Sequence, residues 1–243
     1  MKKIIIIVGC LLIVFGVVAC GIYQSNQRDD IYLVLVNKEN PLPDNWSEKI
    51  QLVEANNCYG EAFQVEQEAL NAFILLHANL IKDGDIDIEL DSTYRSIEEQ
   101  QEIWDDWLND PELGEEYCKQ YLAVPGYSEH HTGLAIDVFL YKDGEPIRDN
   151  DDMIAEKDTF AKIHAKLAEY GFILRYPEGK EDITGYNYEP WHFRYVGNPK
   201  IANEIMEKGI TLEEYLSKTT SFGASILWAF PRLLKELWSS ELI

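Results

Sequence analysis

An almost unbroken apolar run from Ile4 to Tyr23 opens the sequence, directly after Lys2 and Lys3. A helix needs about 20 apolar residues to cross the hydrocarbon core of a bilayer. Residues 1–23 are therefore expected to be a membrane anchor or a signal segment, and this membrane contact is the first partner that the sequence predicts. The two lysines are expected to stay on the cytoplasmic side, which places the acidic bulk of the chain outside the cell.

The end of this run leaves a second outcome open. The residues VVAC at 17–20 resemble a bacterial lipobox, in which Cys20 would be lipidated after cleavage. The apolar run is long for the core of a signal peptide, which favours an uncleaved anchor over the lipoprotein. Either outcome gives the same location, the bacterial cell membrane with the remaining chain extracellular.

The charge balance excludes one large class of partners. The chain carries 43 Asp and Glu against 21 Lys and Arg, a formal net charge of −22. Proteins that bind nucleic acids gain most of their affinity by neutralising phosphates with cations. We therefore expect no nucleic-acid partner.

The 243 residues are enough for one well-packed domain with extensions. We expect a polar linker at 24–30, a single domain at 31–218 and a C-terminal tail at 219–243. The aromatic and leucine content of the tail favours an amphipathic helix on a membrane surface or a docking site, with a helix packed on the domain as the alternative. Pro231 limits that helix to two pieces or a kink.

Some segments of the domain repeat apolar residues every two positions, as strands do, and others every 3.6, as helices do. Strands and helices do not alternate regularly along the chain, which predicts an α+β fold. Ser96 and Glu99 form a capping box, so a helix is expected to begin at Ser96 and to run to about 108. Asp158 is expected to cap a helix that Gly171 ends. The other expected strands are 31–37, 86–92, 133–141, FILRY and WHFRYV, and the other expected helices are Gln64 to Lys82, PKIANEIMEKG and TLEEYL.

The five histidines fall into two groups. His77 and His164 lie on apolar helical stripes, where a hydrogen-bonded core histidine is expected. The remaining three are the adjacent pair in SEHHTGLAID and His192. A catalytic zinc typically takes three nitrogen or oxygen ligands from the protein and keeps one position open. His130 or His131, with Asp137 and His192, could supply that set, and the spacing alone does not choose between the two neighbours.

Glu189 stands before Pro190 in YEPWH. Proline restricts the residue before it and cannot donate to a strand ladder, so Glu189 is expected on the loop before a strand that starts near Trp191. From that loop its carboxylate can approach the same site as His192, in a position suited to a general base.

Two ordered motifs carry a family resemblance. SxHxxGxAxD is present as Ser128 to Asp137, and ExWH as Glu189 to His192, with YRS upstream at 94–96. Together they resemble the zinc D-alanyl-D-alanine carboxypeptidases of the VanY type, whose wider group includes D,D-dipeptidases and peptidoglycan endopeptidases. The resemblance covers about 31–218. It implies a small antiparallel sheet flanked by helices, the hedgehog-like metallopeptidase fold.

The resemblance also implies roles for individual residues. It places Zn2+ on His130, Asp137 and His192, and it makes Glu189 the catalytic base. Arg95 would bind substrate and stabilise the developing oxyanion, and His131 would have a role beside the substrate or behind the ligands. The full set of implied substrate-binding residues is Arg95, Gln100, Ser128 and Trp191. The implied substrate is the peptidoglycan stem peptide ending in D-Ala-D-Ala, or its lipid-linked precursor, in wall remodelling or glycopeptide resistance.

Two other functions fit the sequence less well. An L,D-carboxypeptidase of the same family would cleave tetrapeptide stems, but EPWH rather than ESWH favours D,D activity. A non-catalytic wall-binding module with a structural zinc would not require Glu189 or Arg95, because structural sites usually close all four positions with protein ligands. Cys58 and Cys118 could pair in an oxidising compartment or stay as buried thiols.

Overall fold

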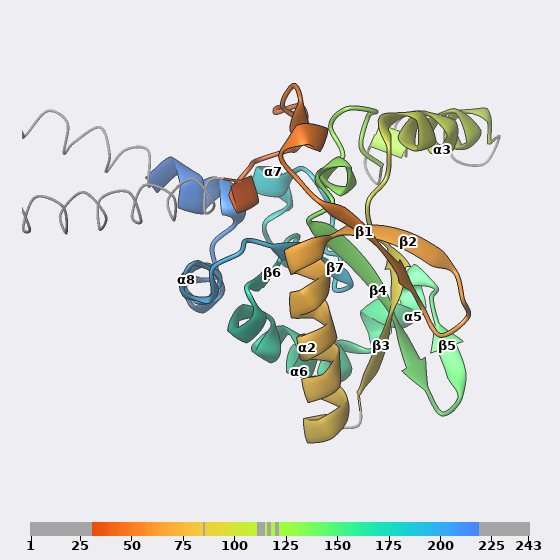
Figure 1. The fold of residues 1–243 in the computed structure, drawn as a ribbon, viewed down its shortest axis with the longest axis vertical. Helices are drawn as coiled ribbons and strands as arrows, with labels where there is room; N and C mark the ends of the chain where they lie inside the picture. The colour runs from red at the N-terminus through yellow and green to blue at the C-terminus, as the bar shows by residue number, and fades with distance from the viewer. Residues whose placement is uncertain (1–30, 85, 111–114, 116–117, 120–121, 219–243) are drawn as a thin grey trace, which may run out of the picture.

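The computed structural model describes residues 31–84, 86–110, 115, 118–119 and 122–218. Its centre is an antiparallel sheet with strand order β3-β4-β7-β6, and β5 pairs with the free end of β4 (Figure 1). A separate antiparallel hairpin, β1 and β2, lies beside it. The strand bounds are β1 Leu52–Asn56, β2 Ala62–Glu66, β3 Asp87–Ser92, β4 Ala135–Lys142, β5 Glu145–Ile147, β6 Phe172–Leu174 and β7 His192–Tyr195.

Helices flank this sheet. The α-helices are α2 Gln67–Gly84, α3 Ile97–Asn109, α5 Asn150–Ala155, α6 Lys157–Leu167, α7 Glu181–Thr184 and α8 Pro199–Lys208, and residues 212–218 are also helical. The short 3-10 helices are η1 Trp46–Glu48, η2 Glu129–Thr132 and η3 Ala168–Tyr170. The predicted α+β class and the antiparallel sheet with flanking helices are confirmed.

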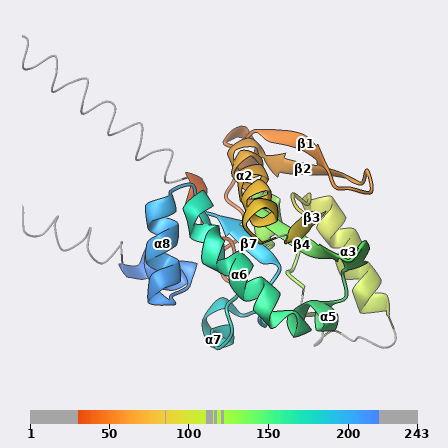
Figure 2. The same cartoon turned by 90° about the horizontal axis from the view of Figure 1, so that it is seen from below.

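The main core lies between one face of the sheet and two helices. α2 and α6 run side by side along that face (Figures 1 and 2). From β4 this face receives Ile136, Val138 and Leu140, which are buried against Phe73 and Phe160 of the two helices. Because side chains alternate along a strand, Asp137 and Phe139 point to the opposite face. Asp137 therefore lies on the face of β4 that is turned away from α2 and α6.

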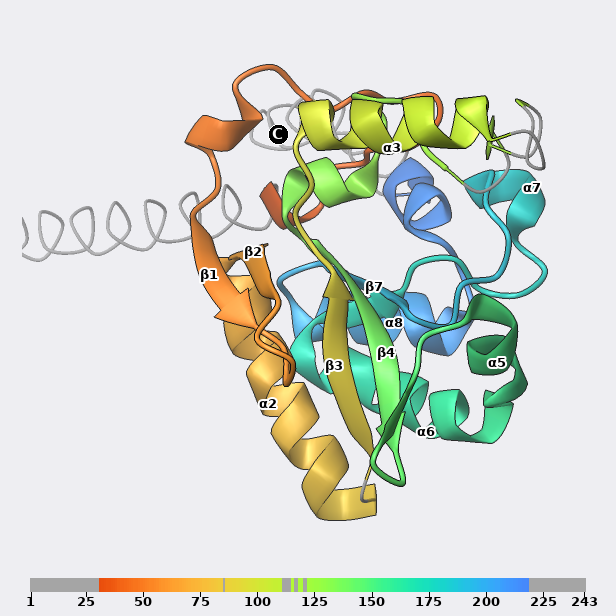
Figure 3. The same ribbon diagram turned by 90° about the vertical axis from the view of Figure 1, so that its right-hand side faces the viewer.

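α3 lies beyond the end of β3, where β4 begins (Figure 3). Its start follows the predicted capping box: Ser96 Oγ accepts from the Glu99 backbone N–H at 3.0 Å, and the Ser96 N–H donates to Glu99 Oε2 at 2.7 Å. Between the end of β3 and the cap residue Ser96 there are only three residues, Thr93, Tyr94 and Arg95. Arg95 is thereby fixed at this end of the sheet.

The predicted strand at 31–37 is wrong. Residues 31–32 form a helical turn, and none of the strands in the described residues pairs with the segment. Its backbone carbonyls bind a side chain instead: the Arg194 guanidinium donates to Tyr32 O at 2.9 Å and to Val34 O at 2.8 Å. The buried Arg194 side chain therefore satisfies backbone carbonyl groups that would otherwise need hydrogen bonds from a neighbouring strand.

Two helix starts also differ from the prediction. α6 is capped at Glu156, one residue before its first helical residue, so Asp158 lies inside the first turn. α2 begins at Gln67 rather than Gln64, because residues 62–66 pair with β1 in a hairpin that the sequence did not predict. Glu66 Oε2 accepts from the Glu68 and Ala69 backbone N–H groups, which stabilises the helix at this junction.

The expected membrane segment 1–23, the linker 24–30 and the tail 219–243 lie outside the described residues. Within the described part of the chain, no helix combines the length and the apolar character that a bilayer crossing requires. Cys58 is exposed and Cys118 is buried, and both are free thiols. The possible disulfide between them is therefore not formed.

Candidate active site

The turn after the histidine pair places His130 beside β4. Ser128 caps the 3-10 helix η2, and Gly133 ends it with φ 71°, donating its N–H to His130 O. The positive φ of Gly133 favours glycine, and a Cβ there would also lie 2.9 Å from a methyl carbon of Leu52, which would have to shift. The tight turn reverses the chain and brings a histidine before it back towards Asp137.

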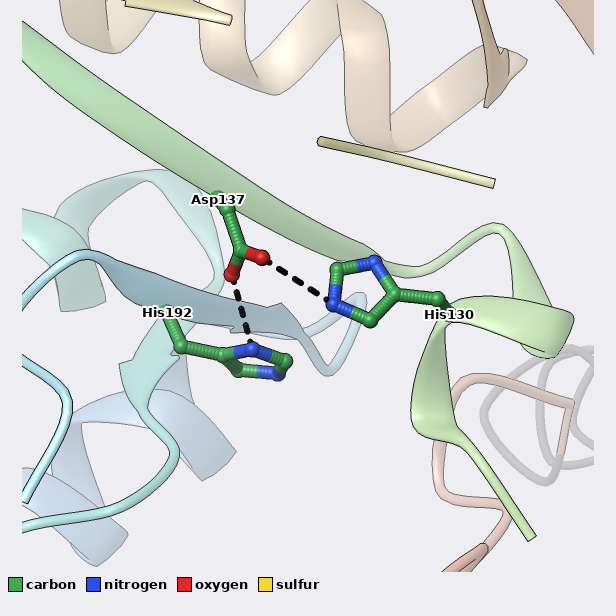
Figure 4. A group of neighbouring side chains, drawn as sticks. All are labelled: His130, Asp137 and His192. Atoms are coloured by element: carbon green, nitrogen blue, oxygen red, sulfur yellow. Dashed lines mark ion pairs between the residues drawn. The ribbon is translucent and has the colours of Figure 1, made fainter. Parts of the chain in front are cut away.

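His130, Asp137 and His192 come together at one point (Figure 4). β4 and β7 are paired with Asp137 opposite His192, which puts both side chains on the same face of the sheet. His192 Nδ1 lies 2.8 Å from Asp137 Oδ1, and His130 Nε2 lies 3.2 Å from Asp137 Oδ2. One ligand atom from each residue lies within 4.8 Å of the others, which is the arrangement of a three-residue metal site.

The second nitrogen of each imidazole is held from behind. His130 Nδ1 donates to Thr93 O at 2.6 Å, and His192 Nε2 donates to Glu129 Oε2 at 3.2 Å. Such partners fix the tautomer and the ring orientation of metal-binding histidines. They leave Nε2 of His130 and Nδ1 of His192 directed at Asp137.

The donor set fits a divalent cation. Asp137 Oδ1 is buried and accepts no hydrogen bond, although His192 Nδ1 lies 2.8 Å away. Two atoms that bind the same metal ion are expected to lie close together without a hydrogen bond between them. Burial opposes charge on His192, but the Asp137 and Glu129 carboxylates outweigh it and raise the pKa of His192 to about 10. Burial also opposes charge on Asp137, yet the two histidines hold its pKa well below the ordinary value. The site therefore stabilises a positive charge between these side chains.

Glu129, which the sequence did not indicate as part of the site, is the buried partner of His192. It is 3% exposed, and its Oε1 accepts from Arg175 Nε at 2.8 Å and from Arg194 Nη1 at 2.6 Å. Both arginines are fully buried. Burial raises the pKa of Glu129, but the two guanidinium groups prevail and hold it far below its usual range. The only sequence signal for a role in the site was its position next to His130. In a chain with so many acids, the sequence does not indicate that this one is buried.

His131 is excluded as a ligand by its own hydrogen bonds. Its Nδ1 donates to Arg95 O at 2.7 Å, and its Nε2 accepts from the Gly126 N–H at 3.0 Å. Both ring nitrogens are therefore occupied by backbone groups, and burial lowers the pKa of this imidazole. The choice between the two adjacent histidines falls on His130, while His131 holds the backbone of Arg95.

A matched pair of substitutions tests this choice. We expect His130→Gln to lose stoichiometric zinc, because the amide removes a ligand nitrogen, whereas His131→Gln can still donate and accept and should retain it. Zinc content after dialysis, measured by elemental analysis on the folded proteins, distinguishes the two variants. Zinc retained by His130→Gln and lost by His131→Gln would reverse the choice.

Glu189 occupies the loop before β7, as the sequence predicted. Its backbone N–H donates to Tyr176 O, and its carbonyl accepts from the His192 N–H. Glu189 Oε2 lies 3.7 Å from His192 Nδ1, and 17% of the Glu189 side chain is exposed. Burial raises the pKa of Glu189 to about 8, with Asp137 and Glu129 adding to the effect and His192 opposing it. A carboxylate whose proton affinity is raised in this way is suited to accept a proton.

The two core histidines of the sequence analysis are hydrogen-bonded, as predicted. His164 Nε2 donates to Pro190 O at 2.8 Å and so fixes the turn that carries Glu189. His77 is half-buried and pairs with Asp87 at 2.8 Å. Neither belongs to the metal-binding group.

Arg95 is held at the same end of the sheet. Its guanidinium donates to Gln100 Oε1 at 2.8 Å and to Ser92 Oγ at 2.9 Å, and Gln100 is itself fully buried, donating to Ala123 O. Burial lowers the pKa of Arg95, while Asp137, Glu99 and Glu189 raise it. The cation therefore faces the carboxylates of the site with its position fixed by two side chains.

The two other residues with an implied substrate role are largely enclosed. Ser128 is 3% exposed, and its hydroxyl accepts from the His130 N–H at 3.3 Å. Trp191 is 9% exposed and packs in the main core. Their contact with substrate stays a prediction.

Comparisons with known proteins agree with this geometry. The model of the VanY family, D-alanyl-D-alanine carboxypeptidase, matches residues 62–198. The bifunctional D-Ala-D-Ala dipeptidase and D-Ala-D-Ala carboxypeptidase VanXYC of Enterococcus gallinarum is 41% identical over 190 residues, which are 75% of this chain and 92% of that protein.

Two solved structures have a similar fold. A mutant of the vancomycin resistance D,D-pentapeptidase VanY from a VanB-type cassette, in complex with Zn(II), superposes with a TM-score of 0.62 at 31% identity, covering 76% of this chain and 99% of that one. The L,D-carboxypeptidase LdcB superposes with a TM-score of 0.66 at 34% identity, covering 77% and 86%. The chain belongs to the VanY family of D-alanyl-D-alanine carboxypeptidases.

Proposed function

We propose that this chain is a zinc enzyme that removes the terminal D-Ala from peptidoglycan pentapeptide stems, with His130, Asp137 and His192 as the zinc ligands and Glu189 as the base. The observation that carries the proposal is the Glu189 carboxylate, which lies 3.7 Å from the ligand nitrogen of His192 and is supplied by the loop just before β7. A structural metal site would have no use for such a group. The three ligand atoms and the orphaned Asp137 oxygen fit Zn2+.

The charges of Glu189 and Arg95 determine which step of the hydrolysis each side chain would assist. Zinc at this site would supply a Lewis acid that activates water and polarises the scissile carbonyl. Glu189 accepts the proton of the attacking water and later delivers it to the leaving amine of D-Ala. Arg95, held by Gln100 and Ser92, provides a fixed positive charge for the developing oxyanion, a contribution that is worth about 10²- to 10³-fold in rate where single donors have been removed.

An L,D-carboxypeptidase is the second candidate function, and one observation favours it. LdcB, an L,D-carboxypeptidase, has a TM-score of 0.66 with this chain, similar to the value for VanY. The two activities share the zinc chemistry and differ in the stereochemistry of the residue before the scissile bond. The family model and the VanXYC relative favour the D,D activity.

The proposed location is the outer side of the bacterial membrane, with residues 1–23 as an anchor or, through Cys20, as a lipidated segment. This placement rests on the apolar run that follows Lys2 and Lys3. It puts the enzyme where lipid-linked precursors emerge from the membrane, and those precursors are the proposed partners beside the mature stem peptides.

Product analysis separates the candidate activities. We expect the full-length chain with zinc to release one D-Ala from a pentapeptide stem and to leave a tetrapeptide stem intact, as measured by mass spectrometry of the products. Shortening of the tetrapeptide alone would establish the L,D activity instead. Turnover that persists after removal of zinc by a chelator would contradict the zinc mechanism.

A further inference from the structure

The last helical segment of the described chain carries a carboxylate that is held in a fixed position. Residues 212–218 are helical, and Thr211 and Glu214 exchange two hydrogen bonds at the start of this segment. The Thr211 N–H donates to Glu214 Oε2 at 2.9 Å, and the Glu214 N–H donates to Thr211 Oγ1 at 3.2 Å, as in a capping box. Leu212 is fully buried in a small core that it shares with β6. The cap and the buried leucine together fix the direction of Glu213, which lies between them in the chain.

Glu213 binds both ends of a buried guanidinium. Arg175 Nη1 donates to Glu213 Oε2 at 3.0 Å, and Arg175 Nη2 donates to Glu213 Oε1 at 2.6 Å. Such bidentate pairs combine strength with a defined geometry. Asn37 Nδ2 also donates to Glu213 Oε1 at 3.1 Å. The Arg175 side chain is fully buried and only 15% of the Glu213 side chain is exposed, so the pair is well shielded from water.

Arg175 reaches the metal ligand His192 along three routes. Its backbone N–H donates to His192 O at 3.3 Å. Its Nε donates to Glu129 Oε1 at 2.8 Å, and the other carboxylate oxygen of Glu129 accepts from His192 Nε2. Its guanidinium carbon lies 5.0 Å from the centroid of the Tyr176 ring, which is 4.7 Å from the centroid of the His192 ring. The orientation of the His192 ring therefore depends on where the Arg175 side chain lies.

The charges behind His192 balance only when Glu213 is included. Arg175 and Arg194 bring two buried positive charges, and both donate to Glu129 Oε1. Arg194 also donates to three backbone carbonyl groups, which carry no charge. Among the residues that the structure describes, Glu129 and Glu213 are the carboxylates paired with these two guanidinium groups. Glu129 alone would leave one buried cation without a counter-ion, which is costly.

From this arrangement we propose that Glu213 is a positioning residue for the metal ligand His192 and acts through Arg175. Without the Glu213 carboxylate, the freed Nη groups of Arg175 can turn to the second oxygen of Glu129, because guanidinium groups bind carboxylates through two parallel hydrogen bonds. That oxygen is the acceptor for His192 Nε2, so the imidazole would lose the partner that fixes its ring. The inference rests on the zinc site of the proposed function and extends its support to the C-terminal helix.

The test compares two neighbouring acids of this helix in the full-length protein. Glu213→Gln removes the charge that faces Arg175. Glu214→Gln is the matched control, because Glu214 is partly exposed and pairs with Lys180, and an amide can still accept from the Thr211 N–H. We expect Glu213→Gln to bind zinc about three- to tenfold more weakly in competition with a chelator, less than the loss of about 10- to 100-fold typical for a direct partner of a ligand. Glu214→Gln should bind zinc as the wild type does.

A spectroscopic measurement separates positioning from stability. In the zinc-loaded protein with isotope-labelled histidine, the Nε2–H proton resonance of His192 reports the hydrogen bond to Glu129. We expect this resonance to move upfield in Glu213→Gln and to stay in place in Glu214→Gln. Glu213→Asp keeps the charge but places it one methylene farther from Arg175. Its zinc affinity and its resonance should therefore lie between those of the wild type and those of Glu213→Gln.

The outcomes are separable. Wild-type zinc affinity together with an unmoved His192 resonance in Glu213→Gln overturns the inference. Equal losses in Glu213→Gln and Glu214→Gln also overturn it, since the helix as a whole rather than the Glu213 charge would then be responsible. If Glu213→Gln does not fold, Glu213→Asp decides the question by the same two measurements. A wild-type protein that binds no zinc would refute the zinc site of the proposed function, a result distinct from all of these.

Discussion

Glu189→Gln is expected to lower kcat by about 10²- to 10⁴-fold while zinc stays bound, because the amide cannot accept the proton of the attacking water. The variant should remain folded. Burial and the neighbouring Asp137 and Glu129 disfavour the charged form of Glu189, so a neutral amide of the same shape relieves that repulsion. The measurement is the steady-state release of D-Ala from a pentapeptide, with zinc content determined on the same sample.

The control for this prediction is Glu178→Gln. Glu178 is an exposed acid on the same long connection between β6 and β7, with 74% of its side chain accessible. The same chemical change there should leave kcat unaltered. Turnover by Glu189→Gln at the wild-type rate would rule out Glu189 as the base, and loss of zinc would show that it acts as a ligand.

Glu129→Gln is expected to have the largest effect on stability. The substitution leaves the guanidinium groups of Arg175 and Arg194 buried without their shared carboxylate, although Glu213 still pairs with Arg175. Removing one partner of a buried ion pair costs about 3–5 kcal/mol. We expect the free energy of unfolding to fall by that amount, as measured by denaturant titration of the chelator-treated protein.

The same variant should also bind zinc more weakly. Glu129 accepts the hydrogen bond of His192 Nε2, and loss of such a partner typically costs about 10- to 100-fold in metal affinity. Glu204→Gln is the control, because Glu204 forms an exposed pair with Lys208 one turn away on α8. Its loss should change neither the unfolding midpoint nor the zinc affinity. Wild-type stability in Glu129→Gln would show that the buried arginines are satisfied without it.

Much of the local structure could be predicted from short stretches of sequence. The capping box of Ser96 and Glu99 starts α3 because both hydrogen bonds join residues three positions apart. The turn at Gly133 and the alternation along β4 are likewise decided within a few residues. These local elements already place Asp137 on one face of a strand, shortly after a histidine pair.

The prediction failed where a long-range partner replaced a local one. Residues 31–37 have the composition of a strand, but Arg194, far along the chain, takes their carbonyl groups. The β1–β2 hairpin was missed, and with it the correct start of α2. In each case the competing hydrogen bonds come from residues that no short window of sequence contains.

The sequence by itself determined the ingredients of the site: two histidine-bearing motifs, an acid on a strand and a glutamate before Pro190. It left the ligand undecided between His130 and His131, and the resemblance to a known family supplied the preference. The tertiary structure decides it physically, because Arg95 O and Gly126 N occupy both nitrogens of His131. It also turns Glu129 into the buried partner of His192. Burial and hydrogen-bond partners are properties of distant segments packed together, so the residue types could be read from the sequence, but their roles depend on the fold.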